Sequence, residues 1–511
     1  MVGARGLVAV RSRQVRASWV LAAVCMSVVI VSLDTTIVNV ALAPISEDLG
    51  ATTTELQWVP DAYLVVYAGL LLLAGAIGDR IGHKRLLAGG LVLFGAGSAL
   101  ASLSGSAGVL IAWRAVMGVG AAAIMPASLA VLTSVFTGER RALALGFWSA
   151  AAGAGVAAGP LIGGALLAGW SWRSVFLVNV PLVVVALAAD AWALPDTAHQ
   201  RRVFDVAGAV LATAAIVAVT AAVIESSTWG WLSGRVGLLF ASGVVAAVGF
   251  VVRQRRAKSA LADLSWFRDR RLGVPCVVAG GLFFALTGAS FVLMLYLQLV
   301  LGYSPLTAGA AILPAVALTM IVAPLAGAIV NTVGARTLMA GGMGFLAAGL
   351  ALFATLTAHS AYWPSILIAG SLFGIGIGLA LTPASDAVMG SRAGQRPGVA
   401  SGIIETAEEL ASALGIAVVG AVVTSRFAAG LSGEPAAVAH QADSLAAALG
   451  AARRLGADHV AQVSAAFAHA MDIGLWVAAA VSAVTALIAL LAMPAQPSVA
   501  ARDSRSREPQ P

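Results

Sequence analysis

"GAIGDRIGHKRLLAGG", residues 75–90, returns later in the chain as "GAIVNTVGARTLMAGG", residues 327–342, with eight of sixteen positions identical. In both copies the stretch joins the end of one long apolar run to the start of the next. An internal repeat of this kind indicates a fold assembled from two similar halves.

The composition indicates which class of protein this is. Of 511 residues, 60% are hydrophobic and 10% are charged, which lies far outside the range of soluble domains. A membrane-spanning helix needs about 20 mostly apolar residues, whereas the strands of a membrane β-barrel are short and alternate. The sequence therefore predicts an all-α polytopic membrane protein with fourteen transmembrane helices, at residues 18–43, 56–78, 86–104, 108–134, 142–168, 174–194, 205–225, 232–252, 272–301, 307–330, 337–358, 364–389, 397–427 and 472–493.

The repeat determines how these spans group. Its two copies follow spans 2 and 10, so two six-span bundles are separated by two extra spans. We predict a cytoplasmic N-terminus (1–17), an N-terminal six-helix bundle (18–194), two inserted spans (205–252), a basic cytoplasmic linker (253–271), a C-terminal six-helix bundle (272–493) with an outer loop (428–470), and a disordered cytoplasmic tail (494–511).

The basic residues predict the orientation, because Lys and Arg prefer short cytoplasmic loops. With the N-terminus inside, 24 of the 30 Lys and Arg residues fall in inner segments. We therefore expect a multi-pass protein of the bacterial cytoplasmic membrane with both termini in the cytoplasm. The net charge of +7 reflects this topology and does not indicate nucleic-acid binding.

The sequence lacks the residues that several classes of function require. Cys25 and Cys276 lie alone in apolar spans, with no spaced Cys or His partner for a metal or redox site. The phosphate-binding pattern GxxxxGK[ST] is absent, and no nucleophile constellation is present, which argues against ATP-driven pumping and against an enzyme. We expect no cofactor and no metal.

The first copy of the repeat, "GAIGDRIGHKR", resembles the signature loop of the major facilitator superfamily. The resemblance implies two six-helix bundles and a cytoplasmic gate, in which glycines allow a tight turn and charged side chains form bonds across the gate. The second copy has Asn331 and Thr332 where the first has an acid and an arginine, so its gate should be weaker. The matching residues are Gly75, Asp79, Arg80, Gly82, Lys84 and Arg85.

Three more stretches resemble the fourteen-span drug:proton antiporters of that superfamily, the EmrB/QacA type. They are "LDTTIVNVALAPI" with Asp34, "LQWVPDAY" with Asp61 near the outer end of span 2, and "WSWRSVFLVNVPL" at residues 170–182. The resemblance implies a role in proton coupling or substrate binding for Asp34 and Asp61. Span 5 carries "GVAAGPLIGG", which matches the motif of exporters, where the proline lets the helix bend and so gate the cavity. The alternative is a plain motif of small residues for helix packing. The motif residues are Gly155, Gly159, Pro160, Gly163 and Gly164.

Asp34 and Arg114 are charged residues inside apolar spans. Asp34 lies roughly 13 Å inside the outer end of span 1 and Arg114 ~9 Å inside the outer end of span 4, at ~1.5 Å per residue. Each needs a counter-charge, so we expect a contact or shared cavity between spans 1 and 4. Asp34 then either binds and releases protons or forms a static pair. Relatives usually have glutamine at the position of Met117, which puts part of this polar network in doubt.

Span 13 carries three acids, Glu405, Glu408 and Glu409, whose spacing places them on one helix face. They lie ~12 to 18 Å from the inner end of the span, near the middle of a ~30 Å hydrocarbon core. Three carboxylates cannot all stay ionised there, so at least one should readily take up a proton. A structural polar role in a wet cavity is the alternative. Span 10 has no acid, so we do not extend to this protein the transport of dications that some relatives carry out.

These features predict a proton-coupled antiporter that exports amphipathic, mainly cationic drugs and confers multidrug resistance. Its partners would be lipophilic small molecules, protons and the lipid bilayer, with no nucleic acid, and the protein would be a monomer. The alternative is a dedicated exporter of one antibiotic or secondary metabolite made by the same cell. An acidic cavity with apolar walls suits flat, lipophilic cations.

Overall fold

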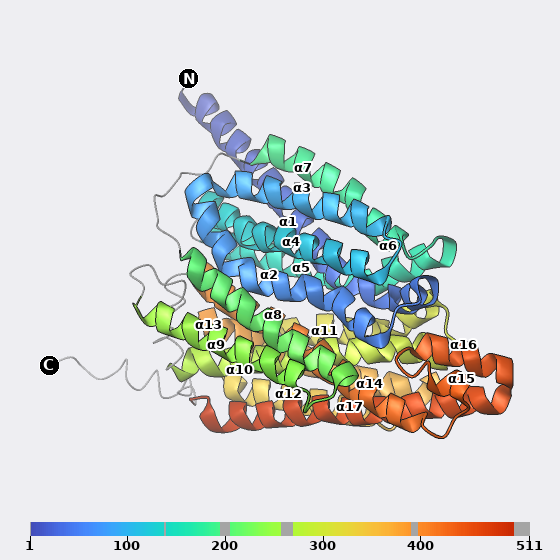
Figure 1. The fold of residues 1–511 in the computed structure, drawn as a ribbon. Helices are drawn as coiled ribbons and strands as arrows, with labels where there is room; N and C mark the ends of the chain where they lie inside the picture. The colour runs from blue at the N-terminus through green and yellow to red at the C-terminus, as the bar shows by residue number, and fades with distance from the viewer. Residues whose placement is uncertain (1, 137–138, 195–204, 257–268, 390–396, 495–511) are drawn as a thin grey trace. The chain divides into compact units, whose positions relative to one another are not determined.

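The computed structural model describes residues 2–136, 139–194, 205–256, 269–389 and 397–494 (Figure 1). This part of the chain is helical and contains no strand. It divides into two compact units, one of Met1–Leu261 with Leu297–Ala310 and one of Ala262–Tyr296 with Ala311–Pro511. The predicted tail and most of the predicted linker lie outside the described residues.

The first unit contains the helices that the sequence assigns to the N-terminal bundle and to the two inserted spans. These are α1 (Val2–Leu49), α2 (Thr53–Ile81), α3 (His83–Ser102), α4 (Ala107–Val135), α5 (Glu139–Gly169), α6 (Ser174–Leu177), α7 (Asn179–Ala193), α8 (Val206–Trp229) and α9 (Gly234–Arg256).

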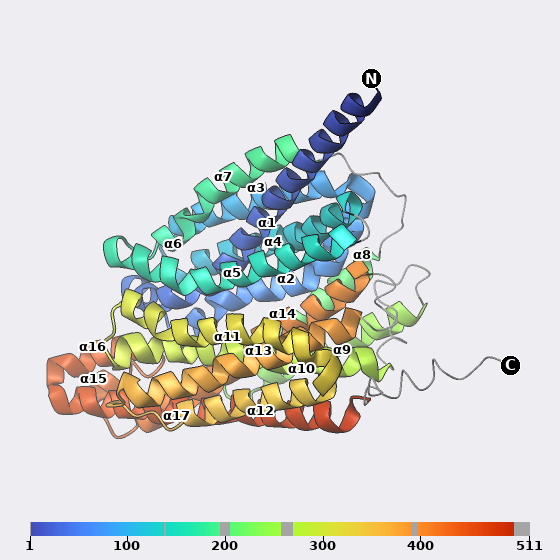
Figure 2. The ribbon, with the colours of Figure 1, turned by 180° about the vertical axis from the view of Figure 1, so that it is seen from behind.

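The remaining helices follow in the order α10 (Arg270–Leu295), η2 (Tyr296–Val300), α11 (Pro305–Val333), α12 (Ala335–Phe353), η3 (Tyr362–Ile366), α13 (Leu367–Met389), α14 (Pro397–Gly430), α15 (Ala436–Ala439), α16 (Leu445–Leu455) and α17 (Ala457–Ala492) (Figure 2). Within the second unit α12 packs along α13 and α17, and α10 packs along α14.

The sequence repeat corresponds to a repeated piece of structure. Gly82 joins α2 to α3 with φ 95°, and Gly334 joins α11 to α12 with φ 90°. Residues other than glycine rarely adopt this backbone conformation, so the turn requires glycine in both copies. Farther along the repeat, a Cβ added to Gly90 would lie 2.9 Å from the Gly120 carbonyl oxygen, and one on Gly342 would lie 2.8 Å from that of Gly376. The two halves thus share a turn and a close helix crossing.

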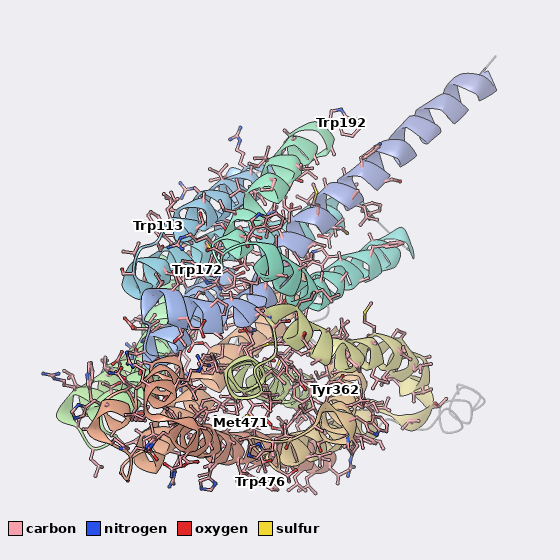
Figure 3. The ribbon with its side chains drawn as sticks, turned by 90° about the vertical axis from the view of Figure 1, so that its right-hand side faces the viewer. Trp113, Trp172, Trp192, Tyr362, Met471 and Trp476 are labelled. Atoms are coloured by element: carbon pink, nitrogen blue, oxygen red, sulfur yellow. The ribbon has the colours of Figure 1, made fainter. Side chains whose placement is uncertain are left out.

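Each predicted span coincides with a helix, but the count of fourteen transmembrane helices stays a prediction. Twelve helices in the described part are long and apolar enough to cross a membrane. They do not include α2, and α8 contributes only the shorter apolar stretch Val210–Ser226. Large apolar side chains are exposed on many of these helices, as Trp192 and Trp476 are (Figure 3). In water such surfaces would be unfavourable, whereas lipid accepts them.

The last helix is longer than the sequence predicts. We expected a span from residue 472, but α17 begins at Ala457. Its first turns have one apolar face that includes the buried Val463 and Phe467, and the ring of Phe467 meets that of Phe427 at 5.7 Å. Because this face packs against α16 and α14, the helix continues beyond its most apolar stretch.

The inserted helices pack on the N-terminal bundle. The hydroxyls of Thr54 on α2 and Thr228 on α8 lie 3.2 Å apart, and a Cβ on Gly69 would overlap Thr213 of α8. At the other end of α8, Asp205 caps the helix and pairs with Arg253 of α9. The two inserted helices are therefore an integral layer of the first unit.

Candidate functional site

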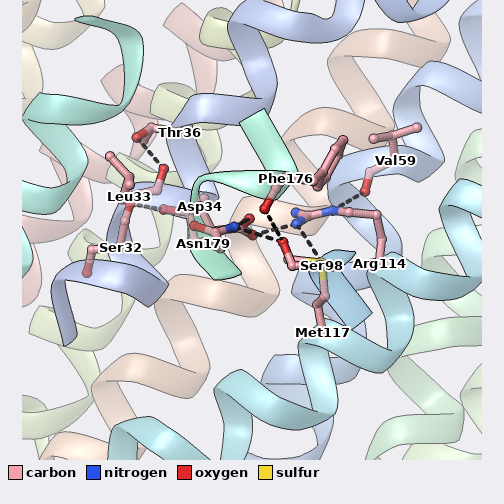
Figure 4. A network of polar contacts seen from close by, with 11 residues as sticks. Ser32, Leu33, Asp34, Thr36, Val59, Ser98, Arg114, Met117, Phe176 and Asn179 are labelled. Carbon is pink, nitrogen blue, oxygen red and sulfur yellow. Dashed lines mark hydrogen bonds and ion pairs between the residues drawn. The ribbon is translucent and has the colours of Figure 1, made fainter. Parts of the chain in front are cut away.

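A buried ion pair lies at the centre of the first unit. Nη1 of Arg114 on α4 donates to Oδ2 of Asp34 on α1 at 2.5 Å, and both side chains are fully buried (Figure 4). The contact expected between spans 1 and 4 is therefore present in the structure. A buried charge pair is costly to break, because removing one partner leaves an uncompensated charge.

The guanidinium of Arg114 is held by a second helix as well. Its Nε donates to the Val59 carbonyl of α2 at 3.0 Å, and its central carbon lies 4.4 Å from the centre of the Tyr63 ring. Met117 approaches Nη1 with its sulfur at 4.0 Å. A thioether is a weak acceptor, so Met117 contributes little polarity to this side of the network.

The other oxygen of Asp34 is occupied by Asn179, which the sequence analysis did not single out. Nδ2 of Asn179 donates to Asp34 Oδ1 at 2.9 Å and to the Ser98 hydroxyl at 3.1 Å. Ser98 in turn donates to the Phe176 carbonyl at 2.8 Å (Figure 4). A polar side chain at the start of the apolar helix α7 was the available signal. Residues of five helices and of the short α6 thus join in one network around this carboxylate.

The glycines of the predicted export motif face the helix that carries Asp34. A Cβ on Gly155 would lie 2.8 Å from the Val29 carbonyl oxygen, and one on Gly163 would lie 2.9 Å from the Ile37 side chain. Gly159 lies between them, and a Cβ there would lie 2.9 Å from the Ile37 backbone nitrogen. Small residues therefore allow α5 to contact the backbone of α1 on either side of the acid.

The structure also shows where the other residues of the predicted export motif lie. Pro160 lies inside α5, and Gly164 faces the backbone of Pro305 and Leu306, which group with the same unit. The hydroxyl of Thr36 on α1 donates to the Val156 carbonyl of α5 at 3.0 Å. The motif thus acts as a packing surface in this conformation, and its gating role stays a prediction.

The signature loop holds the end of another helix. Nζ of Lys84 donates to the carbonyls of Leu194 at 2.7 Å and of Ala191 at 3.3 Å, which are orphan acceptors at the C-terminus of α7. Arg80 and Arg85 are exposed, and a Cβ on Gly75 would lie 3.8 Å from Pro126. The side chain of Asp79 lies outside the described part, as does that of Asn331 in the second copy.

Asp61 is separate from the Asp34 network. It is fully buried on α2, and neither of its carboxylate oxygens has a hydrogen-bond partner among the described residues. Buried carboxylates are usually paired or hydrogen-bonded, so this group is unusual.

The three glutamates lie together on α14 in the second unit. Glu405, Glu408 and Glu409 are half-buried and close enough to interact electrostatically with one another. The apolar residues beside them, including Ile404 and Ala407, pack against Cys276 and its neighbours on α10. None of the three glutamates forms an ion pair within the described part of the chain. Clustered carboxylates of this kind can bind either protons or a cation.

Among the described residues no group of three or more His, Cys, Asp or Glu side chains has a metal-binding arrangement.

Comparisons with known proteins give a family for the chain. The family model described as "Major Facilitator Superfamily" matches residues 24–416. The tetracenomycin C resistance and export protein of Streptomyces glaucescens is 34% identical over 408 residues, which cover 80% of this chain and 76% of that protein. The multidrug efflux pump LfrA of Mycolicibacterium smegmatis is 32% identical over 444 residues, or 86% of this chain and 88% of the pump.

A solved structure supports the fold. A bacterial homologue of the human lysosomal transporter Spinster, in an inward-facing and occupied conformation, superposes with a TM-score of 0.67. The match covers 93% of this chain and 96% of that chain, at 14% sequence identity. At this identity the likeness establishes the arrangement of helices alone.

Proposed function

The chain belongs to the Major Facilitator Superfamily, and we propose that it is a proton-coupled antiporter that exports amphipathic, mainly cationic drugs across the bacterial cytoplasmic membrane. It would confer multidrug resistance and work as a monomer with both termini in the cytoplasm. The similarity to LfrA, a multidrug efflux pump, supports the drug-export part of the proposal. The distribution of Lys and Arg supports the orientation.

The buried network around Asp34 carries the proton part of the proposal. In the structure its two oxygens accept hydrogen bonds from Arg114 and Asn179, on two different helices. A proton added to the carboxylate removes the charge that balances Arg114, so the packing of α1, α4 and α7 must change. Loss of the proton restores the pair. Protonation and helix arrangement are thereby linked, which is the requirement for coupling.

The glutamates of α14 support the choice of substrate. Three half-buried carboxyls with no partner cation in the described residues provide a negative potential, and the surrounding helix surface is apolar. A lipophilic cation gains from both features. In this scheme the cation neutralises the glutamates on its way out, and protons do so on the return.

A second candidate is the export of one antibiotic or secondary metabolite made by the same cell. The specific observation in its favour is the similarity to the tetracenomycin C resistance and export protein. The two candidates differ in breadth of substrate. Transport of unrelated lipophilic cations by the purified protein favours the first, and transport of a single compound favours the second.

The test of energy coupling uses proteoliposomes with an imposed proton gradient and ethidium as a fluorescent probe. One charge crossing 100 mV gains ~2.3 kcal/mol, which supports roughly fifty-fold accumulation. We expect accumulation to collapse on addition of an uncoupler and to be indifferent to ATP. Accumulation that persists without any gradient contradicts proton coupling.

A further inference from the structure

The segment of residues 297–310, which joins α10 to α11, groups with the first unit, while α10 before it and the greater part of α11 after it group with the second. Tyr296 still belongs to the second unit, where its hydroxyl donates to the Thr357 carbonyl at 2.5 Å. Two residues later, Nε2 of Gln298 donates to the Val40 carbonyl of α1 at 2.9 Å. The chain therefore passes from one unit to the other within two residues.

The carbonyl that Gln298 reaches is one that α1 cannot satisfy by itself. In an α-helix each carbonyl accepts from the N–H four residues later, and four residues after Val40 is Pro44. Proline has no N–H, although Pro44 lies inside the helix. Val40 is fully buried, so its carbonyl oxygen needs a donor from elsewhere in the protein. Gln298 supplies that donor.

The same arrangement occurs where α5 crosses α1. Pro160 lies inside α5 and leaves the Val156 carbonyl without its helical N–H, and the hydroxyl of Thr36 on α1 donates to this oxygen at 3.0 Å. Thr36 and Val40 follow Asp34 by two and by six residues on the same helix. A movement of α1 that accompanies a change at Asp34 therefore acts on both bonds.

The backbone of the segment rests on α5. A Cβ on Gly309 would lie 2.4 Å from the Pro160 carbonyl oxygen, and one on Gly164 would lie 2.8 Å from Cα of Leu306. Such close approaches leave no room for a side chain, so the segment is packed tightly against this part of the first unit. The bond from Gln298 joins the packed segment to α1.

We propose that Gln298 and the Val40 carbonyl form an outer latch, which holds residues 297–310 on α1 while the outer side is closed and breaks when that side opens. In the predicted orientation Val40 lies near the outer end of span 1, and residues 297–310 include the outer connection between spans 9 and 10. Parting the two leaves the carbonyl without its donor, so the bond favours the closed arrangement. This inference rests on the proposed transport function, because a latch matters only in a protein that opens.

The test is hydrogen–deuterium exchange on the purified full-length protein, followed in the amides of residues 297–303. The Tyr303 N–H donates to the Leu297 carbonyl at 2.9 Å, so exchange here reports opening of the segment. Gln298→Leu keeps much of the side-chain volume but removes the donor. It should speed exchange about tenfold, the equivalent of about 1.4 kcal/mol. Gln298→Asn keeps the amide but is one methylene shorter, and it should act in the same direction.

Thr307→Val is the matched control on the same segment. Its exposed hydroxyl lies 2.8 Å from that of Ser304, which is also in the segment, so the variant leaves the bond to α1 intact. Exchange of residues 297–303 should stay near the wild-type rate. Peptides of α12 and α13 serve as the reference for the fold and should exchange at wild-type rates in every variant.

A second background tests the role of the proline. Pro44→Ala gives α1 its own N–H for the Val40 carbonyl, so Gln298→Leu should speed exchange by less than about twofold in that background. Wild-type exchange in Gln298→Leu, or an equal acceleration with and without the Pro44→Ala change, overturns the latch. Exchange is measured without substrate or gradient. A wild-type protein that fails to transport ethidium therefore contradicts the proposed function, while the exchange rates still decide the latch.

Discussion

Replacement of Asp34 by asparagine separates a coupling role from a static one. The amide keeps the shape of the side chain but cannot exchange a proton. Arg114 keeps its bond to the Val59 carbonyl and its contact with Tyr63 but loses its only carboxylate in the described part of the chain. The new side chain has one acceptor for the two donors, Arg114 and Asn179, that now reach separate oxygens.

The burial of Asp34 and Arg114 determines how much stability the Asp34→Asn substitution should cost. Both members of the pair are fully buried, and breaking such a pair from one side typically costs about 3 to 5 kcal/mol. Asp48→Asn is the matched control on the same helix, because Asp48 pairs with Arg173 at 2.9 Å while their side chains are 48% and 38% exposed. Water screens an exposed pair of this kind, so this control should change stability little.

The assay measures thermal stability and gradient-driven ethidium accumulation on one preparation of each variant. Asp34→Asn should lower stability and abolish accumulation, whereas Asp48→Asn should keep both near the wild-type values. The double variant Asp34→Asn with Arg114→Gln removes both charges, so it should recover stability without recovering transport. If the double variant regains transport, the pair is static, and normal transport by Asp34→Asn alone refutes a proton on this residue.

Two further predictions concern packing and topology. Gly159→Val should destabilise the protein by about 1 to 3 kcal/mol, because the added Cβ would lie 2.9 Å from a backbone nitrogen of α1, whereas Gly153→Val should be nearly neutral since nothing lies within 4 Å of it. Equal thermal stability of the two variants contradicts the close crossing of α1 and α5. Cysteines introduced at exposed positions test the orientation. Those at Gly105 and Ser432 should react with an impermeant thiol reagent outside intact cells, whereas a cysteine at Arg256 should not. The reverse labelling pattern would invert the topology.

The sequence was sufficient to predict the helical class and the pairing of Asp34 with Arg114. Both follow from the cost of a polar or charged group in an apolar medium, which can be read from residue type and depth. The repeat also predicted two related halves, and the turns at Gly82 and Gly334 share one backbone conformation. Signals of this kind are local in the sequence, so they can be interpreted without knowledge of the tertiary contacts.

Other contacts depend on how distant segments pack, and the sequence did not predict them. Asn179 and Ser98 join the Asp34 network from helices far apart in the chain. The gate role of Lys84 stays a prediction, and nothing in the sequence indicated that this residue also holds the C-terminus of α7. The position of α8 against α2 likewise depends on a fit between Gly69 and Thr213 that no periodicity reveals.

Under the proposed proton coupling, the enclosure of Asp34 has a consequence for proton movement when no substrate is present. Its oxygens are filled by Arg114 and Asn179, and all three side chains are fully buried. A carboxylate in this position exchanges protons with water only after the helices part. Leakage of protons through the resting protein is then as slow as that helix movement, which takes place in microseconds to milliseconds or longer. A substrate that favours the parted arrangement opens the route for itself and for the proton together.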